Sequence, residues 1–198
     1  ILSLAGSVAV ATLVWSGHAG ATEGAAGTLH RASDILHLIA AAVWIGAIGA
    51  FLMLISPQRL REWPGGLQIA SRSLDQFSRV GTICVLVIAA TGLVNSQMIV
   101  GAENLGRSLG SPYGQLLLAK LALFGLMLAL AAANRWQLTP ALAAAVPETN
   151  TDNVAADPDL AIAAMRRSLV IEASAALAIL ALVAWFGTLE PFVAVDPV

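Results

Sequence analysis

DILHLIAAAVWIGAIGAFLMLI, residues 34–55, is the stretch that decides the fold of this chain. It begins with an aspartate and a histidine, Asp34 and His37, and continues with eighteen uncharged residues, 38–55. An uncharged run of this length predicts a transmembrane helix. His37 falls in the first turn of that helix, and an ionisable side chain at such a position indicates a functional site.

The composition of the whole chain agrees with a membrane protein. Of 198 residues, 58% are hydrophobic and 11% are charged, whereas a soluble domain has about 25% charged residues. The formal net charge is −2 and there is no basic patch, so we expect no nucleic-acid partner. Cys84 is the one cysteine, which excludes a disulfide framework and a cysteine-based metal motif. The lipid bilayer is therefore the first expected partner.

Five apolar segments predict an all-α fold, a polytopic bundle of about five transmembrane helices. We expect the whole chain, residues 1–198, to be a single transmembrane helical domain. The first segment is short for a span and the chain begins with Ile1, so we expect this chain to be the C-terminal part of a longer protein. Two longer connections, 58–76 and 140–159, are expected to be loops. The segments are residues 1–15, 34–55, 77–100, 113–135 and 168–189.

The positions of the basic residues predict the orientation in the membrane. Seven lie in or beside the loops 58–76 and 140–159, and three lie on the other side. By the positive-inside rule, these two loops are expected in the cytoplasm. The seven are Arg59, Arg61, Arg72, Arg79, Arg135, Arg166 and Arg167, against Arg31, Arg107 and Lys120, which can extend its amine to the surface.

This orientation gathers all three histidines at the outer membrane face. His18 ends the first segment, His30 lies in the following loop, and His37 begins the second helix. Imidazole is a good ligand for copper and other late first-row metals, and a thioether adds affinity for Cu(I). We therefore predict a metal site formed by His18 and His37, with His30 and Met98 as further ligands.

One stripe of the third helix is expected to face these histidines. Thr91, Asn95 and Met98 are spaced i, i+4 and i+7, and polar groups in spanning helices usually face the bundle interior. Asp34, one turn before His37, is expected to orient an imidazole. Two alternatives without a metal site remain: the histidines can be solvated at the membrane surface, and Met98 can be a packing residue.

Glu172 is an acidic residue within the fifth segment, expected in its first turn or two near the cytoplasmic side. Acidic side chains inside a membrane are costly and indicate function. We expect a structural ion pair with Arg79, Arg166 or Arg167, and the alternative is a relay for protons or cations.

Several pieces of the sequence, in order, resemble the copper resistance protein D (CopD) family of bacterial inner-membrane proteins. The resemblance covers nearly the whole chain and corresponds to the C-terminal portion of longer family members. It implies copper uptake or copper tolerance beside a periplasmic copper carrier of the CopC type, and it places the histidine motifs of the family on His18 and His37. The pieces are SGHA (16–19), SDILHLIAAAVWIGAIGAF (33–51), FSRVG and TGLVNS (within 77–96), SPYGQLLLAKLALFGLMLALAAANR (111–135), RRSLVIE (166–172) and GTLEP (187–191).

Our leading hypothesis is a copper-handling protein of the inner membrane, not an enzyme. Copper would be held at the periplasmic face by the predicted ligands and pass inward through the bundle. A b-type haem electron carrier is the first alternative, since histidine is a common axial ligand of haem iron. The grouping of all histidines near one end argues against it, and a Soret band would support it. A membrane scaffold without a ligand is the second alternative.

Overall fold

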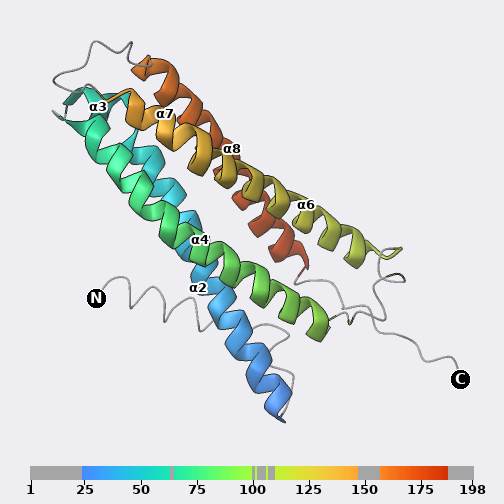
Figure 1. Cartoon of the computed structure of the whole chain (residues 1–198). Helices are drawn as coiled ribbons and strands as arrows, with labels where there is room; N and C mark the ends of the chain where they lie inside the picture. Colours follow the sequence, from blue (N-terminus) through green and yellow to red (C-terminus); the bar gives the residue numbers. More distant parts are fainter. Residues whose placement is uncertain are drawn as a thin grey trace, which may run out of the picture. The chain divides into compact units, whose positions relative to one another are not determined.

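The computed structural model describes residues 24–62, 65–99, 101, 106, 110–146 and 157–186. Every regular element among these residues is helical (Figure 1), which confirms the all-α prediction. The elements are α2 (Gly24–Leu54), α3 (Pro57–Glu62), α4 (Gly66–Ile99), α6 (Pro112–Ala133), the π-helix η4 (Asn134–Leu138), α7 (Thr139–Ala144) and α8 (Pro158–Phe186).

Four helices in the described part of the chain are long and apolar enough to cross a membrane. They are Gly24–Leu54, Gly66–Met98, Pro112–Ala144 and Pro158–Trp185, and they correspond to the second to fifth predicted segments. Large apolar side chains remain exposed along them, such as Leu93 and Leu177, as expected of surfaces that contact lipid. The chain is therefore a multi-pass membrane protein. The first predicted segment, 1–15, lies outside the described residues.

The helices are longer than their apolar segments predicted. α2 begins ten residues before Asp34, and α4 begins at Gly66, within the predicted loop 58–76. α4 has 34 residues, which at 1.5 Å per residue gives about 50 Å, well beyond a hydrocarbon core of about 30 Å. The prediction followed hydrophobicity, but a helix continues through polar residues once its backbone can be hydrated outside the lipid.

Local signals decide where these helices begin and end. The Ser111 hydroxyl accepts a hydrogen bond of 3.1 Å from the Gly114 backbone N–H at the start of α6. Asp157 Oδ1 accepts one of 2.9 Å from the Asp159 N–H at the start of α8. In both cases a proline follows the capping residue, the usual pattern of a helix N-terminus. After α4, Gly101 has a φ of 73°, the left-handed conformation that ends many helices.

The chain forms two compact units, and the long helices contribute to both. The first unit consists of the described residues of 1–44, 83–122 and 179–198. The second consists of Ile45–Thr82 and Leu123–Ala178. The predicted metal ligands that the structure describes belong to the first unit, and Glu172 belongs to the second.

Candidate functional site

Polar side chains of α2 and α4 pair with one another in the first unit. Ser33 Oγ donates a hydrogen bond of 3.3 Å to the backbone carbonyl of Thr91. Asn95 Nδ2 donates one of 3.2 Å to Asp34 Oδ1, and His37 Nδ1 lies 2.9 Å from Thr91 Oγ1. Lipid offers no hydrogen-bonding partner, so polar groups in spanning helices satisfy one another. These three contacts hold α2 against α4 and give His37 a defined position.

The contact between His37 and Thr91 bears on which ring nitrogen can take a ligand. The Thr91 hydroxyl donates its one proton to the backbone carbonyls of Val87 and Ile88 on its own helix. Either tautomer of His37 fits this contact; in the one with the proton on Nδ1, the Thr91 oxygen accepts from His37. Nε2 then keeps its lone pair, the arrangement found in histidines that bind metal through Nε2.

Two charged side chains lie close to this imidazole. Asp34 and Lys120 of α6 both interact electrostatically with His37, and with each other. The Lys120 side chain, which can extend its amine to the membrane surface, is half-buried, and its charge acts on His37. A single lysine inside an apolar helix is the signal that could have identified it in advance, because unpaired charge in a membrane is costly.

His30 and Met98 lie further along the same two helices. His30 precedes His37 by seven residues, which puts both on one stripe of α2. The hydrogen-bonded pairs advance in opposite directions along α2 and α4, so His30 and Met98 both lie beyond the Asp34–Asn95 pair on their helices. His30 is 4% exposed and Met98 is 37% exposed. An imidazole and a thioether thus lie on the same side of the Asp34–Asn95 pair.

Only part of the predicted ligand set belongs to the described residues. It describes His30, His37 and Met98, whereas His18 lies outside the described residues. Among the described residues, no group of three or more His, Cys, Asp or Glu side chains is arranged to hold a metal ion. The metal site thus stays a prediction that depends on His18 and on the thioether of Met98.

Two details of the prediction were wrong. His30 is not in a loop, because α2 already begins at Gly24, and the alanines around it favour a helix. Among the described residues, Asp34 accepts from Asn95 and not from an imidazole, and Thr91 is the residue that contacts His37 Nδ1. The stripe of α4 was therefore placed correctly, but the pairing of its side chains was not.

A second polar pair lies in the second unit. Glu172 is 14 residues after Pro158, in the middle of α8 and not in its first turns. Its carboxyl is 2% exposed and accepts a hydrogen bond from Asn134 Nδ2 of η4. No ion pair of Glu172 is seen in the described part of the chain; Arg166 and Arg167, six and five residues earlier, project from other faces of α8.

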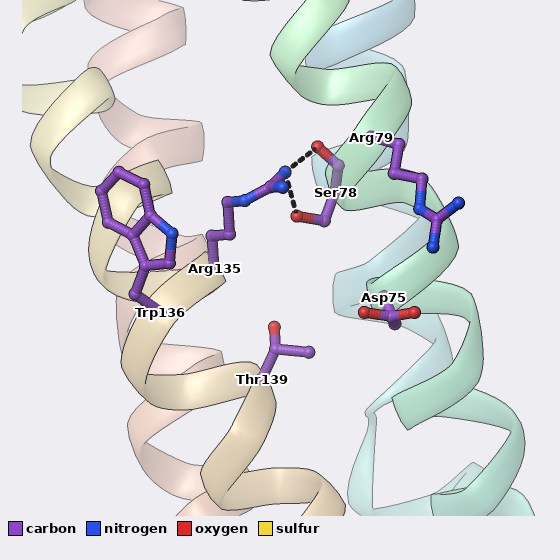
Figure 2. A pocket seen from close by; sticks show the side chains of 6 residues that line it. All are labelled: Asp75, Ser78, Arg79, Arg135, Trp136 and Thr139. Atoms are coloured by element: carbon purple, nitrogen blue, oxygen red, sulfur yellow. Dashed lines mark hydrogen bonds between the residues drawn. The ribbon is translucent and has the colours of Figure 1, made fainter.

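Two neighbouring side chains of the π-helix η4 form hydrogen bonds with different helices. Asn134 donates to Glu172 of α8, whereas Arg135 donates to the hydroxyls of Ser78 and Thr82 on α4, over 2.8 and 2.9 Å. Figure 2 shows the Arg135 side chain directed to Ser78, across a pocket that Asp75, Arg79, Trp136 and Thr139 also line. Short π-helical turns often mark functional positions in helices.

Replacing Thr91 by valine tests how His37 is oriented. Valine keeps the shape but removes the oxygen that hydrogen-bonds Nδ1, so we expect copper affinity to fall by about 10-fold or more, the usual cost of losing an orienting partner. Copper titration of the purified protein measures this. Thr91→Ser keeps the hydroxyl and should retain the wild-type affinity; a loss as large as that of Thr91→Val would contradict the assigned role.

The chain is similar in sequence to known proteins over most of its length. Residues 71–186 match the sequence model of the family described as Copper resistance protein D. Copper resistance protein D of Pseudomonas syringae pv. tomato is 42% identical over 191 residues, covering 96% of this chain and 59% of the relative. Inner membrane protein YebZ of Escherichia coli (strain K12) is 30% identical over 178 residues, 89% of this chain and 54% of the relative.

A third relative matches a shorter part of this chain. Copper transport protein CutJ of Bacillus subtilis (strain 168) is 34% identical over 119 residues, which cover 60% of this chain and 20% of the relative. No solved structure matches the chain. The chain spans between half and three fifths of the length of the first two relatives.

Proposed function

Because this chain belongs to the copper resistance protein D family, we propose that it binds copper at the periplasmic face of the membrane and takes part in copper import or copper resistance. It is a multi-pass protein of the bacterial inner membrane. The observation that supports the proposal is the position of His37, whose Nδ1 lies 2.9 Å from Thr91 Oγ1; in the tautomer with the proton on Nδ1, Nε2 has the lone pair that binds a metal.

The ligand set we propose combines imidazole and thioether groups. His37 supplies Nε2, His18 a second imidazole, and His30 of α2 and Met98 of α4 are the further ligands. Nitrogen and soft sulfur ligands together suit copper, and Cu(I) in particular. Copper is the cargo here, so a site with few ligands that can release the ion is consistent with the role.

The distribution of arginines supports the periplasmic position of this site. Seven of the ten basic residues lie beside the loops on the opposite side of the predicted bundle, which the positive-inside rule assigns to the cytoplasm. A periplasmic copper carrier of the CopC type is the partner we propose to deliver the ion to this face. The names of two relatives, Copper resistance protein D and Copper transport protein CutJ, support copper as the ligand.

Copper accumulation in cells tests the proposal as a whole. Cells that produce the wild-type protein are compared with cells that produce His37→Ala, at equal membrane levels of the protein. We expect the copper content of His37→Ala cells to match that of cells without the protein. Leu36→Ala is the matched control, because Leu36 is exposed on the neighbouring position of α2. Equal copper content in wild-type and His37→Ala cells would refute the proposed role.

A further inference from the structure

Glu172 is a buried carboxyl group that the copper proposal does not use. Its one hydrogen-bond donor in the described structure is Asn134 Nδ2. Two more polar atoms of the same region are buried and have no partner there, namely Asn134 Oδ1 and Ser168 Oγ. Ser168 lies one turn before Glu172 on α8 and is 5% exposed. Buried polar atoms in native proteins rarely lack a partner, so each unpaired one calls for an explanation.

Three arginines near Asn134 or Glu172 in sequence do not pair with this carboxyl. Arg135 follows Asn134 in the chain but donates to Ser78 and Thr82, as Figure 2 shows for Ser78. Arg166 donates to the backbone carbonyl of Ile55 over 3.4 Å. Arg167 is exposed. No positive side chain in the described ranges therefore neutralises Glu172, and an ionised carboxylate without a counter-ion is strongly disfavoured at such a position.

We propose that Glu172 and Asn134 form a proton-binding site within the membrane. In this site, Asn134 Nδ2 donates to Oε1 of Glu172, as observed, and the proton on Oε2 is donated to Asn134 Oδ1. A carboxylic acid and a primary amide each carry one acceptor and one donor on the facing edge, so the two groups close a ring of two hydrogen bonds. The ring satisfies the unpaired amide oxygen and leaves no net charge.

The polar groups at this site suit a bound proton and not a copper ion. Glu172, Asn134 and Ser168 offer a carboxyl, an amide and a hydroxyl oxygen, all hard ligands, whereas Cu(I) prefers sulfur and imidazole. Ser168 Oγ, which is also unpaired, provides one more polar group next to the ring. The site shares no residue with the proposed copper ligands, so a failure of the copper proposal would leave this inference unaffected.

Infrared spectroscopy of the protein in lipid membranes tests this inference. We expect a C=O stretch of a protonated carboxylic acid at neutral pH in the wild type, and we expect Glu172→Gln to abolish it. Glutamine can form the same two hydrogen bonds to Asn134, so this variant should fold. Asp75→Asn is the matched control, since Asp75 is an exposed carboxyl in the same unit and its removal should leave the band unchanged.

The band must also respond to its surroundings. Asn134→Leu should shift it to higher frequency because the acid loses its hydrogen-bonded amide, and exchange into D2O should shift it in the wild type without any substitution. Absence of an acid band at neutral pH would overturn the inference. Disappearance of the band on adding sodium at constant pH would also overturn it, since the site would then bind an alkali cation in place of a proton.

Discussion

Copper affinity is expected to fall by at least about 100-fold when His18 and His37 are both replaced by alanine, because loss of an orienting partner alone costs about 10–100-fold. The substitution removes two imidazoles, including that of His37, which Thr91 contacts through Nδ1. Isothermal titration of the purified protein with copper measures the change. The affinity that remains in the double variant sets an upper limit for copper binding by His30 and Met98.

The control for this experiment is Leu36→Ala, which removes an exposed apolar side chain of α2 next to His37 and should leave copper affinity unchanged. Circular dichroism of each variant confirms that the helices are intact. Equal affinities of the wild type and the double variant would end the assignment of His18 and His37 as ligands.

Asn134→Leu is expected to lower the free energy of unfolding by about 1–3 kcal/mol, the cost of leaving a buried polar group without its partner. Leucine removes the N–H that donates to Glu172 and leaves this carboxyl group buried at 2% exposure with no described donor. Thermal or denaturant unfolding of the protein in detergent micelles, followed by circular dichroism, measures the difference.

A second substitution separates the pair from a local packing effect. Replacing Glu172 by leucine in the Asn134→Leu variant removes both members of the pair, and exchange of a buried polar pair for apolar residues is often nearly neutral. We therefore expect the double variant to recover most of the lost stability. If Asn134→Leu alone unfolds like the wild type, the Asn134–Glu172 contact contributes nothing measurable.

Much of the candidate site follows from the spacing of residues along single helices. The stripe of Thr91 and Asn95 was predicted to face the histidine-bearing helix, and both residues contact α2. The choice of partners was not predictable, because it depends on how far two helices are shifted and rotated against each other. Asp34 and His37 both lie on α2, and the position of α4 gives Asp34 the partner Asn95 and His37 the partner Thr91.

The partner of Glu172 was also not predictable from the sequence. A lone acid in an apolar helix predicted a functional or paired group, and burial agrees with this. An arginine partner was expected because arginines lie nearby in sequence, but the nearest ones project from other faces of α8. The partner Asn134 is 38 residues away in sequence, and the π-helix in which it lies has no signal in the hydrophobic pattern.

Sequence by itself determined that this chain is a bundle of membrane helices. Hydrocarbon excludes any span with unsatisfied backbone groups, so a long apolar run must be a helix whatever its neighbours are. Only the tertiary structure decided which polar side chains meet: His37 with Thr91, and Glu172 with Asn134. Hydrogen bonds act over about 3 Å, so their partners depend on the register and rotation of whole helices, which no single helix specifies.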